Sequence, residues 1–268
     1  MKSVLTIAGS DSSGGAGIQA DIKTIESFGL FATSAITAIT AQNTCGVRAV
    51  QDIEASVVSD QIDAVFEDIR PDAVKIGMVS SASIIEVIAN RLKVWDADRI
   101  VVDPVMVATS GARLIDEDAV FVLQRKLLPL ASVITPNIPE AQALCGSAIA
   151  SDGDVLRAAQ LLSRKFRVSV LVKGGHREGA ADDLLVSRDG EPLWLRSERI
   201  ATENTHGTGC TLSSALACGL AQGLDVATAV RQAKAYVRGA LSSGLDLGAG
   251  SGPLDHMWCH AQPDVQFD

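Results

Sequence analysis

Short runs of β-branched and apolar residues alternate along the chain with longer segments in which apolar positions recur every three or four residues. The short runs predict strands at 3–9, 32–40, 72–77, 99–104, 132–137 and 168–175, with a shorter pair near 183–196. The longer segments predict helices at about 15–28, 56–69, 81–93, 116–128, 152–165, 209–222 and 225–241.

This alternation, with strands about 30 residues apart, is typical of parallel βαβ units and predicts a doubly wound α/β fold. No linker, low-complexity segment or internal repeat divides the sequence, so we expect residues 1–268 to form a single domain. Ligands of such folds bind beyond the carboxyl ends of the strands. The residues that follow each predicted strand are therefore the candidates for a functional site.

Composition narrows the possible functions. Hydrophobic residues make up 47% of the 268 residues, which is enough for a sizeable core. The net charge of −9, without a dense Lys/Arg cluster, argues against nucleic acid as a partner. No apolar run reaches about 18 residues, so we expect no membrane span, and we recognise no signal peptide. Five irregularly spaced cysteines without a CxxC pair favour free thiols and a cytoplasmic location.

A glycine-rich loop, "GSDSSGGAG" (9–17), follows the first predicted strand. The segment "GAGIQA" (15–20) fits a relaxed dinucleotide fingerprint. However, its approach from the strand is too long, and no acidic residue ends the second strand to hold a ribose. We favour the wall of a small-molecule pocket, with a ligand-free glycine turn as the alternative. Asp21, one turn into the helix, would contact the ligand or simply be favoured by the helix dipole.

Polar side chains and a thioether follow the next strands. Gln42 follows the second strand, and its amide both donates and accepts, which suits an aminopyrimidine edge; the alternative is a polar loop residue. Met78 follows the third strand, and it either contacts a ligand or packs in the core. Lys173 ends the sixth strand as a solvated cap or as a point charge on a nucleotide phosphate.

The segment "NIPE" (137–140) has two interpretations. Asn137 fits an N-cap, the proline a first turn, and Glu140 the partner residue of a capping box. Alternatively, Asn137 and Glu140 lie near phosphates and a metal ion, assisted by Asp103 after the fourth strand. Few carboxylates together with water and phosphate are what Mg²⁺ usually binds. Another segment, "DHMWCH" (255–260), contains possible metal ligands, but it is a weak candidate for a metal site because no second ligand cluster accompanies it.

The loop "NTHGTGCTLSSALA" (204–217) joins a glycine turn to a predicted helix. Gly207, Thr208 and Gly209 would point backbone N–H groups at an anion, where the helix dipole is positive. We expect the same helix end to lower the pKa of the Cys210 thiol. The alternatives are a structural turn with a buried cysteine, or cysteine hydrolase chemistry with His206 as base. The papain-type sequence around the thiol is missing.

Seven motifs occur in a characteristic order: "AGSDSSGGAGIQADIKT", "AITAQNT", "KIGM", "VDPVM", "TPNIPEA", "VKGGH" and "THGTGCTLSSA". Together they resemble the ribokinase-like superfamily, and within it the hydroxymethylpyrimidine/phosphomethylpyrimidine kinases of bacterial thiamine biosynthesis. The resemblance implies a three-layer α/β/α fold with a mostly parallel central sheet. Most of the superfamily carries aspartate where Cys210 stands, and this subfamily carries cysteine. We recognise no added thiamine-phosphate synthase domain, and residues 244–268 match least.

The resemblance implies ATP-dependent phosphorylation of 4-amino-5-hydroxymethyl-2-methylpyrimidine to the monophosphate and then the diphosphate. ATP is the expected co-substrate, Mg²⁺ the cofactor and a homodimer the assembly. Cys210 would take the proton of the substrate. The other implied roles are pyrimidine binding by Gln42, Asp21, Gly9, Met78 and Val105, an anion hole of Gly207, Thr208 and Gly209, and binding of ATP and Mg²⁺ by Lys173, Asn137, Glu140 and Asp103.

A cysteine suits this chemistry if the transition state is loose and the nucleophile loses its proton late, because a strong carboxylate base is then not essential. One anion-hole loop implies one site for both phosphorylations, with the small residues 14–17 leaving room for a phosphate already on the substrate. Two other functions stay open. One is a pyridoxal or pyridoxine kinase, whose substrate also carries a hydroxymethyl group on an aromatic ring. The other is a non-catalytic pyrimidine or nucleotide sensor.

Overall fold

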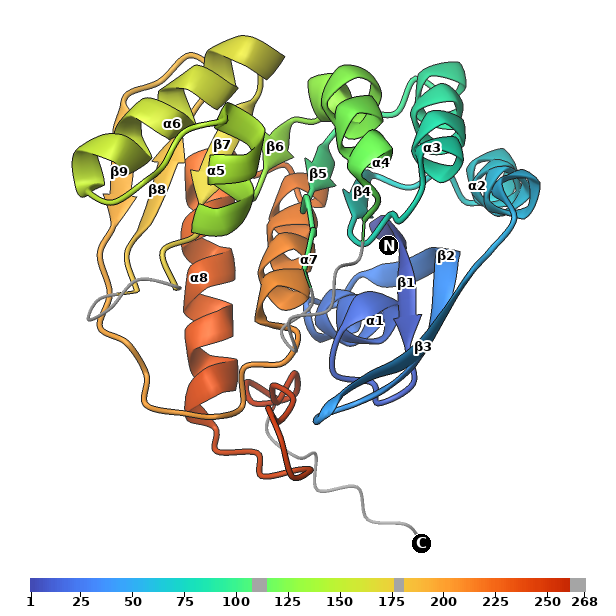
Figure 1. Ribbon diagram of the computed structural model, residues 1–268. Helices are drawn as coiled ribbons and strands as arrows, with labels where there is room; N and C mark the ends of the chain where they lie inside the picture. The colour runs from blue at the N-terminus through green and yellow to red at the C-terminus, as the bar shows by residue number, and fades with distance from the viewer. Residues whose placement is uncertain (108–114, 176–180, 261–268) are drawn as a thin grey trace, which may run out of the picture.

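The computed structural model describes residues 1–107, 115–175 and 181–260, and a nine-stranded sheet runs through it (Figure 1). The strand order is β3-β2-β1-β4-β5-β6-β7-β8-β9. Pairing is parallel from β2 to β7 and antiparallel for β3 at one edge and for β8 and β9 at the other. The strands are β1 (Ser3–Asp11), β2 (Phe31–Asn43), β3 (Gly46–Asp52), β4 (Ala73–Ile76), β5 (Ile100–Val102), β6 (Val133–Ile134), β7 (Ser169–Val172), β8 (Asp183–Val186) and β9 (Pro192–Leu195).

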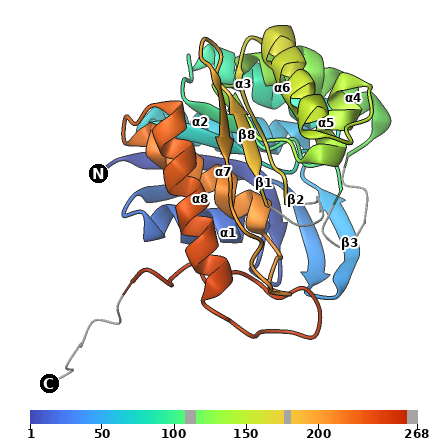
Figure 2. The same cartoon turned by 90° about the vertical axis from the view of Figure 1, so that its left-hand side faces the viewer.

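Helices cover both faces of the sheet, as Figure 2 shows. One face carries α1, α7 and α8, and the other carries α2 to α6. This confirms the three-layer α/β/α arrangement. The helices are α1 (Gly17–Ser27), α2 (Ala55–Asp68), α3 (Ala82–Val94), α4 (Glu117–Val122), α5 (Ile138–Cys145), α6 (Asp152–Phe166), α7 (Thr208–Ala221) and α8 (Val226–Ser242).

The sheet separates two cores because successive side chains of a strand point to opposite faces. In β1, Val4 packs toward α7 and α8, and Leu5 packs toward the helices of the other face. Helix α7 is buried almost all round from Thr211 to Ala221, which its small and apolar residues allow. Its N-terminus is thereby held at the carboxyl ends of the central strands, and the first turn keeps its polar groups there.

The structure corrects several predicted boundaries. Strand β1 continues beyond its predicted end at Gly9 to Asp11, and β2 continues to Asn43, so Gln42 lies within a strand rather than after it. The predicted helix 116–128 is a short α4 followed by a π-helical turn, η1 (Leu123–Leu127), and a 3₁₀ turn, η2 (Leu128–Leu130). Strand β3 was not predicted, and the start of helix α5 was predicted only through the capping interpretation of "NIPE". Most of β3 is exposed on an antiparallel edge, so it lacks a buried face that would show in the hydrophobic pattern.

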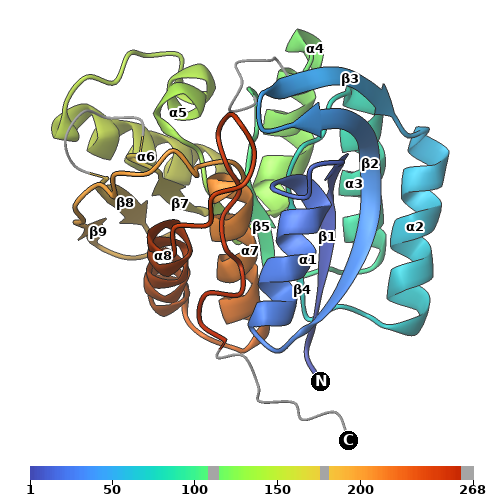
Figure 3. The ribbon, with the colours of Figure 1, turned by 90° about the horizontal axis from the view of Figure 1, so that it is seen from below.

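The segment that follows α8 runs back past α7, as Figure 3 shows. The Ser251 N–H donates to the Thr44 carbonyl at 3.1 Å, and the His206 N–H donates to the Gly252 carbonyl at 3.0 Å. These bonds join the C-terminal segment to the β2–β3 hairpin and to the loop before α7. Within the described ranges, none of the helices combines the length and apolar character needed to cross a membrane.

Candidate active site

The turn that begins α7 is shaped by its glycines. Gly207 is the N-cap and has φ 84°, in the left-handed region that favours glycine. A Cβ at this position would also lie 1.8 Å from the carbonyl oxygen of Gly15. Glycine is therefore required at position 207 for two reasons: its backbone conformation and the close approach of the Gly15 carbonyl. The loop before α7 packs directly on the glycine loop that follows β1.

The predicted nucleotide-side residues meet at this turn. A Cβ on Gly209 would lie 3.2 Å from Asp103 Oδ2 and 3.4 Å from Lys173 Nζ. Lys173 Nζ itself is 2.6 Å from Asp103 Oδ1 and 4.0 Å from Glu140 Oε2. Thr135 Oγ1 donates to Asp103 Oδ1 at 2.8 Å. Residues from the ends of β5, β6 and β7 thus form one charged cluster beside the first turn of α7.

Burial and mutual charge set the protonation of this cluster. Burial raises the pKa of Glu140 to about 7, while the Lys173 ammonium opposes that rise. Burial lowers the pKa of Lys173, but the carboxylates of Asp103 and Glu140 outweigh it and leave the pKa raised. Lys173 therefore stays cationic at neutral pH. A fixed cation beside a helix N-terminus is suited to hold the phosphates of a nucleotide.

The capping interpretation of "NIPE" is confirmed by two hydrogen bonds. The Glu140 N–H donates to Asn137 Oδ1, and the Asn137 N–H donates to Glu140 Oε2, each at 2.8 Å. Both side chains therefore hold the start of α5, and Glu140 also faces Lys173 across 4.0 Å. The side-chain carbonyl oxygen of Asn137 caps the helix, and among the described residues its NH₂ group has no hydrogen-bond partner.

Cys210 is the third residue of α7 and is half-buried. The Gly17 N–H, at the start of α1, donates to its sulfur, so the first turns of two helices meet at the thiol. Burial nevertheless raises the pKa of Cys210 to about 11, although Lys75 acts to lower it. The expected lowering of this pKa is wrong, because the loss of hydration and the Asp21 and Asp103 carboxylates outweigh the effect of Lys75. The resting form at neutral pH is the thiol.

The Thr208 N–H does not have the role predicted for it in the anion hole. Its N–H donates to the Thr205 carbonyl at 3.3 Å, and its Oγ1 donates to the same oxygen at 2.8 Å. The turn that precedes α7 uses this amide, since the chain reverses direction there. The first-turn amides of a helix have no partner within the helix, so Gly209 and Cys210 are the better anion donors of this loop.

Asp21 does not fit its predicted role as a direct pyrimidine contact, because it has no exposed surface. Both of its oxygens contact Lys75 Nζ, at 2.8 and 2.7 Å. Thr6 and Ser214 also donate to it, at 2.5 and 2.7 Å. Burial lowers the pKa of Lys75, but Asp21 outweighs it and leaves the pKa raised. Sequence reasoning missed Lys75, since a lysine inside "VKIG" shows nothing of the carboxylate that pairs with it.

The first glycine loop packs closely on its neighbours at two of its glycines. A Cβ on Gly17 would lie 2.2 Å from the Gly9 carbonyl oxygen, and one on Gly15 would lie 2.5 Å from His206 Cδ2. Among the described residues, a Cβ on Gly14 would meet only Lys23 Nζ, at 3.3 Å, so room for a substrate phosphate beside residues 14–17 stays a prediction. Gly9 also lies against Met78, whose sulfur would be 3.2 Å from a Cβ at position 9. Val105 is half-buried beside Asp103, to whose carbonyl its N–H donates at 2.8 Å.

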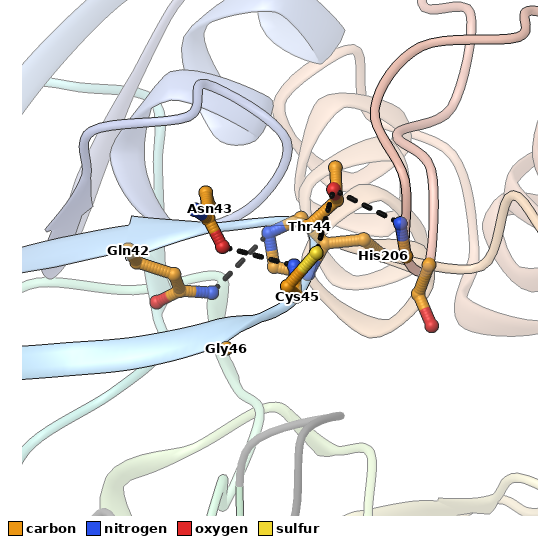
Figure 4. A pocket seen from close by; sticks show the side chains of 8 residues that line it. Gln42, Asn43, Thr44, Cys45, Gly46 and His206 are labelled. Carbon is orange, nitrogen blue, oxygen red and sulfur yellow. Dashed lines mark hydrogen bonds between the residues drawn. The ribbon is translucent and has the colours of Figure 1, made fainter.

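A pocket of about 370 Å³ opens beside Gln42, within the size range of small-molecule sites (Figure 4). The turn of the β2–β3 hairpin forms one side, and His206 and the C-terminal segment form the other. Its lining residues are Gln42, Asn43, Thr44, Cys45, Gly46, His206, Gly250 and Ser251. Sequence reasoning missed Gly250 and Ser251, because nothing in their local sequence shows that they return to the hairpin.

The segment 255–260 does not form a metal site. His256 Nε2 lies 3.0 Å from Thr211 Oγ1, and burial lowers the pKa of His256 to about 4. His260 Nε2 donates to the Ser27 carbonyl at 2.8 Å. Across the part of the chain that the structure describes, no three His, Cys, Asp or Glu side chains gather as metal ligands. These histidines hold the C-terminal segment against α7 and α1.

Comparison with known proteins gives a consistent result. A family model described as phosphomethylpyrimidine kinase matches residues 11–255. A hydroxymethylpyrimidine/phosphomethylpyrimidine kinase of Rhizobium meliloti is 53% identical over 94% of this chain and 96% of its own.

Solved structures agree with the family model. A phosphomethylpyrimidine kinase from Clostridium difficile is 46% identical, with a TM-score of 0.79 over 89% of this chain and 98% of its own. A pyridoxal kinase of Bacillus subtilis, solved with ADP, is 35% identical, with a TM-score of 0.88 over 96% of this chain and 98% of its own. The fold is thereby confirmed as ribokinase-like, and the chain belongs to the hydroxymethylpyrimidine/phosphomethylpyrimidine kinase family.

Proposed function

We propose that this protein phosphorylates 4-amino-5-hydroxymethyl-2-methylpyrimidine with ATP, and then phosphorylates the monophosphate to the diphosphate, in thiamine biosynthesis. The observation that carries the proposal is the position of Cys210. The charged cluster of Asp103, Glu140 and Lys173 lies beside the turn that holds the thiol. The N–H of Gly17 donates to the thiol. Gly17 also packs on Gly9, one of the residues that we expect to contact the pyrimidine.

The reaction requires one proton acceptor. The hydroxymethyl oxygen attacks the γ-phosphorus, a new P–O bond forms, and the bond to ADP breaks. The Cys210 thiol first gives its proton to solvent, and the resulting thiolate accepts the proton of the alcohol late in the step, while the N–H groups of Gly209 and Cys210 hold the phosphoryl oxygens. Because the pKa of the thiol is about 11, the thiolate is a minor form at neutral pH. It is, however, a strong base once formed.

Mg²⁺ fits the oxygen donors near Lys173. The Asp103 carboxylate uses Oδ1 for Lys173 and Thr135, and its Oδ2 faces Gly209. With Glu140 it gives two carboxylates, the hard donors that Mg²⁺ prefers alongside water and phosphate. When bound, the ion would neutralise charge on the nucleotide phosphates. Lys173 would hold the phosphates as a second cation.

A panel of alcohols tests the substrate assignment. Backbone similarity does not separate the pyrimidine from pyridoxal, because pyridoxal kinases share this fold. ADP release with Mg-ATP should be fastest for the hydroxymethylpyrimidine, with lower kcat/KM for pyridoxine and pyridoxal. A higher kcat/KM for pyridoxine would identify a pyridoxine kinase. Tight binding of the pyrimidine without ADP release from any alcohol would identify a sensor.

We further infer a homodimer in the cytoplasm. The five cysteines all lie in the described part of the chain, and none forms a disulfide, as expected in a reducing compartment. Light scattering coupled to size-exclusion chromatography should give twice the mass of 27.9 kDa. A mass of one chain at micromolar concentration would contradict the dimer.

A further inference from the structure

A buried acid–histidine pair stands beside the amide that faces the pocket. His206 Nε2 lies 2.8 Å from Asp11 Oδ2 and 3.3 Å from Gln42 Nε2. His206 and Asp11 are 5% and 3% exposed. Figure 4 shows the Gln42 amide and the His206 ring next to each other in the lining of the pocket. His206 Nε2 thus has a carboxylate and an amide as neighbours. Whether this nitrogen carries a hydrogen determines which hydrogen bonds it forms with each of them.

Asp11 determines where that proton lies. Burial acts to raise the pKa of Asp11, but hydrogen bonds from His206, Ser13 and the Ala16 N–H lower it to about 2. The carboxylate is therefore ionised at neutral pH and can only accept. A lone pair on His206 Nε2 would face this anion at 2.8 Å. His206 Nε2 must therefore carry a hydrogen, in the neutral ring as well as in the cation.

A protonated His206 Nε2 selects one of the two amide orientations of Gln42. With the amide NH₂ toward the ring, two donors would face each other at 3.3 Å. A half-turn of the amide brings its carbonyl oxygen to His206 and its NH₂ to Thr40 Oγ1, which lies 3.3 Å from the other end of the amide. Thr40 Oγ1 gives its own hydrogen to the Ser10 carbonyl at 3.0 Å, so it can accept. The single hydrogen on His206 Nε2 is then shared between Asp11 Oδ2 and the Gln42 carbonyl oxygen, and one N–H of the amide meets Thr40 Oγ1.

We infer that Asp11 and His206 are positioning residues that hold the Gln42 amide with its carbonyl toward His206 and its NH₂ toward Thr40. The second N–H of that NH₂ group is then available for an acceptor nitrogen of a ring in the pocket. The second lone pair of the carbonyl is available for an amino group beside that nitrogen. An aminopyrimidine carries this acceptor–donor pair on one edge. The identity of the ring rests on the proposed function, whereas the orientation of the amide does not.

The tautomer of His206 tests the orientation in the ligand-free protein. The chain has four histidines, so selective ¹⁵N labelling and long-range ¹H–¹⁵N correlation resolve each ring. The His206 signals are those lost in His206→Gln, or those assigned through the backbone. We expect a protonated Nε2 at pH 7. An unprotonated Nε2 would overturn the inference, whatever reaction the protein catalyses.

Kinetics with two replacements test its effect on the substrate. His206→Gln keeps an N–H donor near Gln42, and His206→Leu removes it. We expect His206→Leu to raise KM for the pyrimidine about tenfold with KM for ATP unchanged, and His206→Gln to recover most of that loss. Equal losses in both variants, or a parallel rise in KM for ATP, would overturn the positioning role. A wild-type enzyme that phosphorylates no alcohol would instead refute the proposed function.

Discussion

At the residue scale, Cys210 shows how burial and local dipoles compete. The first turns of α1 and α7 both point at the sulfur, and a buried lysine lies near, yet the pKa is about 11. Desolvation of the thiolate, together with the nearby Asp21 and Asp103 carboxylates, therefore outweighs these favourable effects in the ligand-free protein. A sequence shows the helix start but not the depth of burial, so the sign of the shift was not predictable from the "GTGC" motif.

We predict that alkylation of Cys210 by iodoacetamide rises about tenfold for each pH unit between 7 and 9. Only the thiolate reacts, and below a pKa of about 11 its fraction grows in proportion to hydroxide. Peptide-resolved mass spectrometry measures the rate. The exposed Cys45 and Cys259 serve as accessible thiols in the same sample, and ATP with substrate should protect Cys210 alone. A rate that levels off below pH 8 would contradict the raised pKa.

The Asp21–Lys75 ion pair is the other residue-scale feature, since both side chains have no exposed surface. Four elements meet at this carboxylate, because Thr6 comes from β1, Lys75 from β4 and Ser214 from α7, while Asp21 itself is on α1. Removing one partner leaves an uncompensated buried charge, which typically costs about 3–5 kcal/mol.

Lys75→Met should therefore lower the free energy of unfolding by roughly 3–5 kcal/mol. Combining it with Asp21→Asn should restore a large part of that loss, because the amide keeps an acceptor for Thr6 and Ser214 without the charge. Urea denaturation followed by circular dichroism gives both values. If Lys75→Met is as stable as the wild type, the pair is not the buried contact described above.

At the element scale, helices α5 and α6 both begin with a capping box, and only the box of α5 lies beside the charged cluster of Asp103, Glu140 and Lys173. Asn137 and Glu140 form the capping box of α5, and Ser151 and Asp154 form that of α6. The α5 box includes Glu140, which faces Lys173, whereas the α6 box is exposed. The two N-caps therefore allow the helix-capping contribution to be separated from a contribution to nucleotide binding.

We expect Asn137→Ala and Ser151→Ala each to lower stability by about 1 kcal/mol, the usual value of an N-cap. Only Asn137→Ala should also raise KM for ATP, because its NH₂ group is free to meet the nucleotide. Thermal denaturation and steady-state kinetics on both variants provide the comparison. An unchanged KM for ATP in Asn137→Ala would restrict this residue to helix capping.

At the scale of the whole molecule, the hydrophobic pattern predicted the layered α/β fold, and residues after several strands come together in the candidate site. The pattern could not predict contacts between distant segments. Neither the pairing of Lys75 with Asp21 nor the return of Gly250 to the hairpin has a local signal. Strand β3 escaped prediction because it is an exposed edge without an apolar face. The glycine loops lie where the sequence placed them and pack closely on their neighbours, whereas anion binding by them stays a prediction.

The central claim is that one site, with Cys210 as proton acceptor, performs both phosphorylations. Phosphorus NMR of purified enzyme with Mg-ATP and either the alcohol or its monophosphate tests this most directly. The account predicts the monophosphate from the alcohol and the diphosphate from the monophosphate. It also predicts that Cys210→Ala, while still folded, loses both activities together by roughly 10²–10⁴-fold. Diphosphate formation that survives in Cys210→Ala while alcohol phosphorylation is lost would contradict a shared site.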